Sequence, residues 1–573
     1  MLRWLTAAIV AFVCSAQGVI AGETWPGFRR SPWFEECRRE AWLEGSVRAL
    51  MIAPPRFEAD RPTQLIIFAT PNGNTIEQTL GSACAAETDW RFDIQHIAAQ
   101  VRLWRSLQPD VNVVLACIEA EGLSWPGWRR TQTDAAAKTR RIVDALRSWV
   151  PAPCTVVLAG HSGGGSFLFG FLDAGDTVPD AIDRFLFLDA NYSYDDNLKH
   201  GDKLLAWLRR DERRHLIVIA YDDRDVTLNG KKVVSPTGGT FRATERMRTR
   251  FLQDVEFLPS TTGPFQTAKA LEGHITIHVH PNPDNKILHT ALVGEMNGLL
   301  EGLGVGRTVM WGTFGGPRAY VDFVQPAAEI PPRPADAEGG AAFMRRVAHL
   351  SRMERETAIA EEFIRGNLPD FLRRWQPIEV KAVDDAGCEH VARFEVLPDY
   401  LSVGSDADFV RVPMTPQTAE QIAERFGAAL PTKKMVDDIA RHATVCLTPQ
   451  PLTQDREAVA TFLQHHLLIE EQFGDRPRGG LVAGIKKDVV VSNRLDERPN
   501  RLALYGWHQR DGSPIQPLTT VHVDWYVDYS HGVRLVKRTV TVDHQPRDIR
   551  HVLRDSQLYR LLSDEGPVLR GTY

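Results

Sequence analysis

Residues 155–172 read TVVLAGHSGGGSFLFGFL, and this stretch decides the fold expected for the first half of the chain. The apolar run Thr155 to Ala159 is typical of a buried β-strand, and Gly165 to Leu172 fits a helix. Between them stands Gly160-His161-Ser162-Gly163-Gly164, a G-x-S-x-G pattern. Five letters alone are a weak signal, but a serine nucleophile needs a tight strand-to-helix turn, which this context supplies. We therefore predict that Ser162 is a nucleophile, with an ordinary glycine-rich turn as the alternative.

The residues around this turn alternate short apolar runs with longer helical stretches such as Phe92 to Ser106 and Thr133 to Trp149. Near-continuous apolar runs are typical of parallel strands that are buried on both faces. The alternation predicts a doubly wound α/β domain over residues 22–323. Its expected strands are Leu65 to Ala69, Val111 to Cys117, Thr155 to Gly160, Phe185 to Asp189, Leu216 to Ala220 and His274 to His280.

A serine nucleophile also needs donors for the oxyanion that forms on the attacked carbonyl. The backbone N–H of Gly163, which follows the serine, is the first expected donor. A second donor is expected in the loop after an earlier strand, and here Leu65 to Ala69 runs into Thr70 to Thr75. We predict the N–H of Asn74 as this donor, and a surface Pro-Asn-Gly turn is the alternative.

From about residue 45 to residue 305 the chain resembles the α/β-hydrolase superfamily in its G-x-S-x-G turn, in the loop before it and in the order of its elements. The resemblance implies a mostly parallel, eight-stranded sheet with flanking helices. It also implies a triad of serine, acid and histidine in that chain order. The histidine is expected after the last strand, so His289 is the predicted general base. His274, His278 and His280 are the alternatives for this role, but their even spacing places them on one face of a strand, where they are expected to pack or hydrogen-bond.

The resemblance places the acid after the seventh strand, which here is Leu216 to Tyr221. The following loop carries three aspartates. Asp225 is favoured because it stands a few residues past the strand and before an apolar residue; Asp223 is second and Asp222 third. A minority of the superfamily places the acid after the sixth strand, where Asp189 stands here. The three loop aspartates could also form a solvated turn.

The first 21 residues differ from the rest of the 573-residue chain. Arg3 precedes an apolar run from Leu5 to Cys14, and Val19 and Ala21 fit the −3 and −1 positions of a cleavage site. We expect a signal peptide cleaved after Ala21 and a secreted or periplasmic protein, with an uncleaved anchor as the alternative. The rest of the chain is of ordinary composition, with 24% charged residues and a net charge of −6. Nucleic acid is not an expected partner, because no basic block dominates.

The second half of the chain is expected to be a separate domain. Residues 324–340, VQPAAEIPPRPADAEGG, are rich in Pro, Ala and Gly and predict a linker. Residues 341–573 mix helical and β-type segments, which predicts an α+β domain that resembles no characterised family. Thr415 and Thr432 are expected to cap helices that run to Phe426 and Ala443. The expected strands are Asp488 to Ser492, Arg501 to Trp507, Val521 to Val527 and Val533 to Val542.

Two polar segments of this half invite a functional interpretation. One is Asp528 to Arg534, with His508, His522 and Asp524 upstream, and the other is Gly484 to Asp488 with its two lysines. The histidine and aspartate spacing matches no metal signature, so a turn between strands is expected at the first segment and a solvated strand start at the second. No metal or organic cofactor is predicted.

These observations lead to one principal hypothesis, one from another class and a third that places separate chemistry at His522, Asp528 and His531. The first is a secreted serine hydrolase that cleaves an ester or amide bond of a small molecule or an envelope polymer through an acyl-enzyme on Ser162. The alternative is a cell-envelope or glycan-binding protein in which the α/β domain is a non-catalytic scaffold.

Overall fold

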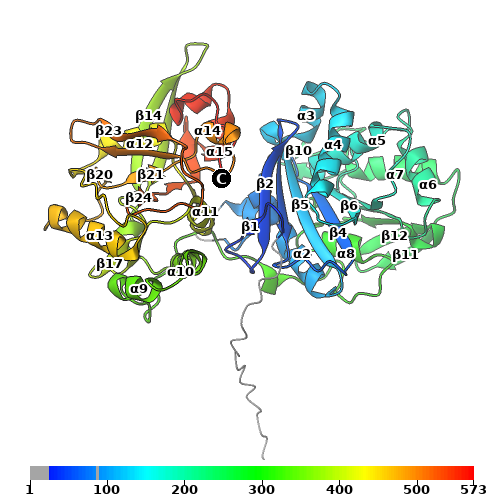
Figure 1. The fold of residues 1–573 in the computed structure, drawn as a ribbon. Coiled ribbons are helices and arrows are strands. Elements are labelled where there is room, and N and C mark those ends of the chain that lie inside the picture. Colours follow the sequence, from blue (N-terminus) through cyan, green and yellow to red (C-terminus); the bar gives the residue numbers. More distant parts are fainter. Residues whose placement is uncertain (1–24, 85–88) are drawn as a thin grey trace, which may run out of the picture.

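The computed structural model describes residues 25–84 and 89–573, which form two lobes joined by one extended segment (Figure 1). The predicted signal peptide lies outside the described residues. The N-terminal lobe is built on one 11-stranded sheet, and the C-terminal lobe contains several smaller sheets. No helix of the described part combines the length and the apolar character that crossing a membrane requires.

The large sheet has the strand order β1-β2-β3-β5-β4-β6-β7-β8-β13-β12-β11. Its central strands pair in parallel, whereas β3 is antiparallel to both of its neighbours. The strands are β1 (Arg29–Arg30), β2 (Cys37–Leu43), β3 (Val47–Ala53), β4 (Thr63–Ala69), β5 (Asn112–Ala120), β6 (Cys154–His161), β7 (Ile182–Leu188), β8 (His215–Tyr221), β11 (Leu258–Thr262), β12 (Phe265–Ala270) and β13 (Ile275–His280).

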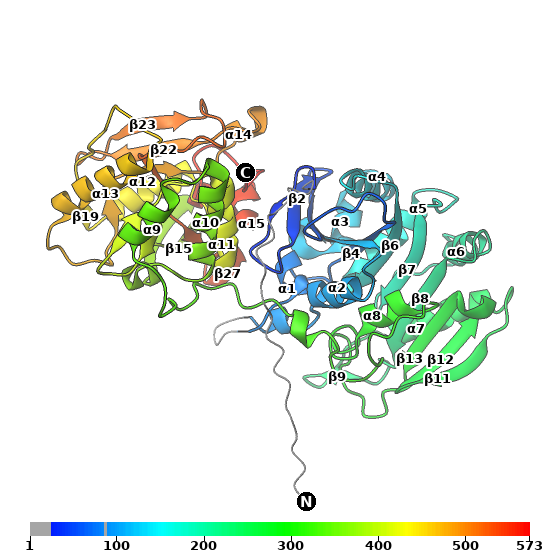
Figure 2. The same cartoon turned by 60° about the horizontal axis from the view of Figure 1, so that its bottom comes forward.

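This strand order is that of the α/β-hydrolase fold. Eight of the strands, β2 to β8 and β13, can be numbered 1 to 8 in chain order. Their order across the sheet is then 1-2-4-3-5-6-7-8. The carboxyl ends of the parallel strands therefore meet at one edge, where this class of sheet carries its sites. The predicted fold class is confirmed, and the hairpin of β11 and β12 extends the sheet beyond β13 (Figure 2).

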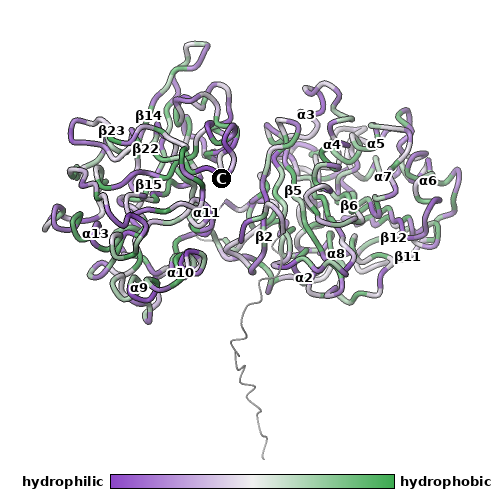
Figure 3. Tube along the Cα trace, viewed as in Figure 1, coloured by the Kyte–Doolittle hydropathy of each residue, from purple (hydrophilic) through white to green (hydrophobic). Residues whose placement is uncertain are grey.

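Helices cover both faces of this sheet, because successive side chains of the buried strands point to opposite sides. Leu65 and Ile67 of β4 pack with the helices of one face, and Ile66 and Phe68 pack with those of the other. The first face carries α3 (Trp125–Thr131), α4 (Ala135–Ser148), α5 (Gly165–Asp173), α6 (His200–Leu208) and α7 (Thr240–Phe251). The second face carries α1 (Ile76–Leu80), α2 (Ile97–Ser106) and α8 (Gly298–Gly304). Hydrophobic residues accordingly follow the central strands β5 and β6 (Figure 3).

The C-terminal lobe is an α+β structure with two main sheets. One contains β14 (Gln376–Val383), β15 (Glu389–Val396), β18 (Ala428–Ala429), β25 (Val536–Lys537), β26 (Thr539–Val542) and β27 (Gln545–Asp548). The other contains β21 (Lys487–Val489), β22 (Leu504–His508), β23 (Pro514–Thr519) and β24 (His531–Gly532). The main helices are α9 (Gly340–Val347), α10 (Arg352–Ile364), α11 (Pro416–Arg425), α12 (Lys433–His442), α13 (Val459–Phe473) and α15 (Ile549–Arg554).

Several predicted elements of this lobe are confirmed and one is wrong. Thr415 and Thr432 cap α11 and α12, as predicted, by accepting a hydrogen bond from the third helical N–H. The predicted strand at 521–527 is wrong, because only an isolated bridge joins Val523 to Arg501.

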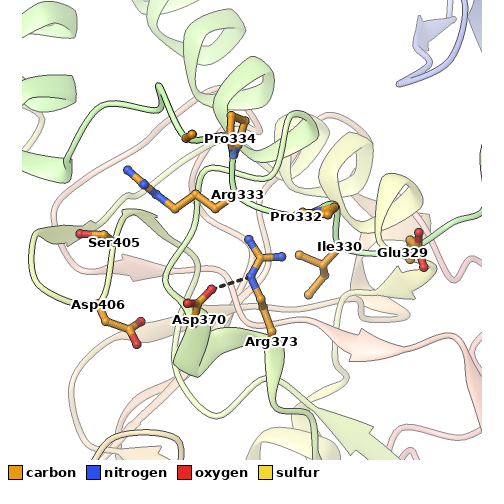
Figure 4. Close-up of a pocket in the computed structure, with 10 residues that line it drawn as sticks. Glu329, Ile330, Pro332, Arg333, Pro334, Asp370, Arg373, Ser405 and Asp406 are labelled. Atoms are coloured by element: carbon orange, nitrogen blue, oxygen red, sulfur yellow. Dashed lines mark hydrogen bonds and ion pairs between the residues drawn. The ribbon is translucent and has the colours of Figure 1, made fainter.

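The segment 324–340, predicted as a linker, is held against the C-terminal lobe. Arg333 donates to the carbonyl oxygens of Ala337 and Gly404, and Arg373 donates to that of Pro331. These two arginines line a cavity of about 660 Å³, in which Arg373 also pairs with Asp370 (Figure 4). Backbone carbonyl oxygens accept hydrogen bonds from the guanidinium groups of Arg333 and Arg373. These two arginines therefore hold residues 324–340 in place.

A charged interface joins the two lobes, with α15 facing β2 in both ribbon views (Figures 1 and 2). Arg550 of α15 donates to Glu40 of β2 at 2.9 Å and to Glu77 of α1 at 2.8 Å. Arg48, which is completely buried, pairs with the same two glutamates. Nε2 of His551 lies 2.9 Å from Oε1 of Glu119. Burial opposes ionisation of Glu40, but Arg48 and Arg550 together lower its pKa to about 2.

Candidate active site

Ser162 stands on a strained turn at the carboxyl end of β6. Its φ of +53° places it in the left-handed region, which a residue with a side chain adopts only when its surroundings enforce it. A Cβ at Gly164 would lie 2.3 Å from the carbonyl oxygen of Ala69, so only glycine lets the turn approach β4 so closely. Helix α5 begins at Gly165, directly after the turn. The sequence prediction of a strand, a tight turn and a helix around Ser162 is confirmed.

His289 lies beside this turn, in the loop that follows β13. The ring of His161, the residue before Ser162, lies 4.5 Å from the ring of His289. Nε2 of His161 is also 2.9 Å from the backbone oxygen of His289. Burial and the neighbouring His289 lower the pKa of His161 well below its usual range, so His161 is neutral and its Nε2–H donates to that carbonyl. The loop is thereby fixed against the turn that carries the serine.

The side chain that holds the ring of His289 is Asp189. Its carboxylate lies 2.5 Å from Nδ1 of His289, and the hydroxyl of Thr240 donates to its other oxygen. Asp189 is fully buried at the end of β7, with a φ of +48°. Its N–H donates to the carbonyl of Ile219 on β8 at 2.7 Å. The structure thus brings the histidine together with the aspartate after the sixth strand, the position that sequence reasoning had ranked behind the loop aspartates.

The favoured loop aspartate, Asp225, does not reach His289. Its side chain is 71% exposed and pairs with Lys232 at 2.7 Å across the small hairpin of β9 (Thr227–Leu228) and β10 (Lys231–Lys232). Asp222 pairs with Arg224. The exposed position of Asp225 and the pairing of Asp222 with Arg224 leave neither carboxylate on the His289 ring, which instead contacts Asp189.

Asp223, the second choice, is buried close to Asp189 without contacting His289. The N–H of Thr240 donates to its carboxylate at 2.8 Å, and the Thr240 hydroxyl lies between the two aspartates. Its Oδ1 has no hydrogen-bond partner among the described residues. Burial, reinforced by the charge of Asp189, raises the pKa of Asp223 to about 6. The site therefore contains two neighbouring acids, of which only Asp189 contacts the imidazole.

The loop before α1 lies against the serine turn. A Cβ at Gly163 would lie 2.0 Å from Oδ1 of Asn72, which shows that the Asn72 carboxamide packs on the Gly163 backbone. The N–H of Asn74, the predicted second donor, is directed to the carbonyl of Pro71 at 3.4 Å. The Nδ2 group of Asn74 is buried and has no partner in the described part of the chain. Asn72 was missed in the sequence, although it belongs to the same Pro-Asn-Gly turn.

His274, just before β13, and His278 and His280 within it form hydrogen bonds inside the lobe, as expected. His274 bonds to the backbone oxygen of Arg214, and His278 bonds to the Thr267 hydroxyl, both at 2.9 Å. His280 accepts from the N–H of Asn282. Within residues 25–84 and 89–573, no group of three or more His, Cys, Asp or Glu side chains is arranged to hold a metal ion.

Comparison with known proteins gives likeness of structure only. No family model and no curated protein matches the chain. A cold-adapted esterase from an Arctic intertidal metagenomic library is 14% identical with a TM-score of 0.23, covering 43% of this chain and 84% of its own. A siderophore hydrolase from Aspergillus nidulans is 13% identical with a TM-score of 0.27, covering 50% and 96%. A poly(aspartic acid) hydrolase from Sphingomonas is 13% identical with a TM-score of 0.24, covering 39% and 88%. Such low TM-scores say nothing about the reaction, and the fold assignment rests on the strand order.

Proposed function

We propose that the N-terminal lobe is a serine hydrolase in which Ser162, His289 and Asp189 form the catalytic triad. The observation that carries the proposal is the 2.5 Å contact between Asp189 and Nδ1 of His289 beside a serine with a φ of +53°. A buried carboxylate on Nδ1 fixes the tautomer that leaves Nε2 free to take a proton. A strained serine turn at the carboxyl edge of the sheet presents its hydroxyl to a substrate.

In the proposed reaction, Oγ of Ser162 attacks the carbonyl carbon of an ester or amide while His289 takes the hydroxyl proton. Asp189 stabilises the imidazolium that forms, and the oxyanion accepts a hydrogen bond from the N–H of Gly163. His289 then returns the proton to the leaving alcohol or amine, which breaks the scissile bond and leaves an acyl-enzyme. Water, deprotonated by His289, attacks the acyl carbon, and His289 returns that proton to Oγ of Ser162 as the acyl bond breaks, which releases the acid and free Ser162.

The second oxyanion donor is proposed in the loop of residues 70–75. The carboxamide of Asn72 lies against the Gly163 backbone, and its Nδ2–H group is the donor that we propose. The sequence predicted the N–H of Asn74 as the second donor. To bind an oxyanion, this N–H would have to give up its 3.4 Å hydrogen bond to the carbonyl oxygen of Pro71.

Steady-state hydrolysis of a p-nitrophenyl ester tests the proposal. We expect Ser162→Ala to lose nearly all activity, since removing a triad member of a serine hydrolase costs on the order of 10⁴- to 10⁶-fold in kcat. Ser166→Ala, at the first turn of α5, is the matched control and should keep its activity. Full activity of Ser162→Ala, with an unchanged circular dichroism spectrum, would refute the assignment.

Export of the protein is part of the proposal and rests on the sequence of residues 1–21 alone. Sequencing the N-terminus of protein taken from culture medium or periplasm tests it, with residue 22 expected first. The substrate is proposed only as an ester or amide of a small molecule or an envelope polymer. The alternative, a glycan-binding protein on a non-catalytic scaffold, predicts no turnover of any ester and saccharide binding by the C-terminal lobe.

A further inference from the structure

A second group of buried ionisable side chains lies in the C-terminal lobe, away from Ser162. Strands β21 and β24 pair in parallel and place Lys487 opposite His531 (Figure 1). This pairing joins the two polar segments that stood out in the sequence. Lys486, Asp528 and His531 are each 1% exposed, and His465 of α13 is equally buried beside them.

The unusual feature of this group, which we call the Lys486 cluster, is its unpaired nitrogen atoms. Neither ring nitrogen of His531 has a hydrogen-bond partner among the described residues, and the same holds for Nδ1 of His465. Lys486 donates to the carbonyl oxygen of Tyr529, and no carboxylate of the described residues lies within 4.0 Å of its amine. Buried polar groups without partners are rare, because each costs about 1–3 kcal/mol.

The carboxylate oxygens of Asp528 are, in contrast, already occupied. One oxygen of Asp528 accepts from the N–H and hydroxyl of Ser530, and the other accepts from Arg456 and the Tyr526 hydroxyl. His531 is 3.6 Å from Asp528, which is too far for a hydrogen bond. Burial lowers the pKa of His531 to about 3, so its ring is neutral and its two unpaired nitrogens are one donor and one acceptor. The cluster therefore has unpaired N–H donors on Lys486 and His531 and no free oxygen of Asp528 to accept from them.

Positive charge predominates in the same place. Lys486, Lys487 and Arg456 lie near the carboxylate of Asp528, and Asp399 is a second carboxylate near Lys486 that is already paired with Arg411. Burial and the nearby Arg411 lower the pKa of Lys486 to about 7, and burial lowers the pKa of Lys487. An added negative charge would offset both the unpaired charge and the missing acceptors.

The outer side of the Lys486 cluster is aromatic and half-exposed. The rings of His522 and Tyr526 are stacked at 4.4 Å, and Tyr526 lies 5.6 Å from His531. Trp525 is 52% exposed next to them. On the inner side, Trp507 is buried with a φ of +57°, a strained conformation for an aromatic residue and one that is concentrated at functional sites.

We propose that the Lys486 cluster is a second ligand site, which binds a small molecule through a carboxylate or another oxyanion. The oxyanion accepts hydrogen bonds from the amine of Lys486 and from a ring N–H of His531, and Lys487 contributes further positive charge. The stacked His522 and Tyr526 contact the remainder of the ligand. No covalent step is involved, and the site does not depend on Ser162.

Thermal unfolding of the full chain at constant ionic strength tests this proposal with acetate, inorganic phosphate and methylammonium as probes. A ligand that binds only the folded state raises Tm in a saturable manner. We expect acetate or phosphate to do so and methylammonium to have no effect. A stronger response to acetate assigns a carboxylate ligand, and a stronger response to phosphate assigns a phosphorylated one.

Two variants and a control complete the test. Lys486→Met, which keeps the length of the side chain, and His531→Gln should each weaken anion binding at least tenfold. Lys381→Met, on the exposed pair with Glu389, should leave it unchanged. Ester hydrolysis at Ser162 should persist in all three, which separates this proposal from that of the first site. Absence of a saturable anion effect in the unmodified protein, or an equal effect in both folded cluster variants, would overturn the proposal.

Discussion

The carboxylate of Asp189 lies 2.5 Å from Nδ1 of His289, and the hydroxyl of Thr240 donates to its second oxygen. The contact connects the end of β7 with the loop after β13, two segments separated by 100 residues in the chain. Asp189 is fully buried, so water does not compete for its oxygens. This contact orients the imidazole and makes Asp189 the proposed acid.

The first prediction concerns the choice between the aspartates. Asp189→Asn should lower kcat for ester hydrolysis by about 10⁴-fold, because an amide at this position favours the wrong histidine tautomer. Asp225→Asn should change kcat less than twofold, since Asp225 is exposed and pairs with Lys232. A large loss of kcat in Asp225→Asn and none in Asp189→Asn would instead identify Asp225, in the loop after β8, as the acid.

The second prediction concerns the pH dependence of stability through Asp223. Its pKa is about 6 in the folded protein, against about 4 in an unfolded chain. The folded state therefore binds more protons between pH 4 and pH 6, and the free energy of unfolding falls as pH rises through this window. In Asp223→Asn, the free energy of unfolding should fall less between pH 4 and pH 7, by up to about 3 kcal/mol, as measured by chemical denaturation. An unchanged pH profile in Asp223→Asn would show that the carboxyl ionises normally.

The third prediction tests Asn72 as an oxyanion donor. Asn72→Ala should reduce kcat by on the order of 10²-fold with little change in KM, because the bond is made to the transition state. Asn74→Ala keeps its backbone N–H and should retain most activity. If Asn72→Ala is fully active, backbone groups of the loop supply the second donor.

The fourth prediction concerns the interface between the lobes. Arg550→Met should destabilise the protein by about 3–5 kcal/mol, since it leaves Glu40 and Glu77 buried without this partner. Arg560→Met removes a more exposed pair with Asp385 and should cost less than about 1 kcal/mol. Equal losses in urea denaturation would show that the buried network adds nothing. Because α1 follows the loop of Asn72, Arg550→Met should also lower ester hydrolysis.

The features that sequence reasoning found were those fixed by local chemistry. The apolar run before Gly160 and the glycines around Ser162 indicate a strand and a close turn, and the structure confirms both. Thr415 with Pro416 likewise marks the start of α11. Chain order alone led to His289, because the last strand of the sheet is recognisable from its apolar residues.

The contact between Asp189 and His289 could not be predicted, because it depends on contacts between distant loops. Asp189 and Asp223 both follow buried strands, and the sequence does not say which carboxylate faces the imidazole. The hairpin of β9 and β10 carries Asp225 into solvent, and Thr240, far along the chain, holds Asp189 in place. In the second half, the alternation of Ile378 and Val380 with charged residues was a usable signal for β14 that went unnoticed.

Labelling with a fluorophosphonate probe tests the central claim most directly, because the probe reacts covalently only with an activated serine. The probe should modify Ser162 with one adduct per chain, identified by peptide mass spectrometry, and Asp189→Asn should slow the labelling strongly. Absence of labelling in the folded protein, or an adduct on a serine other than Ser162, would contradict the account.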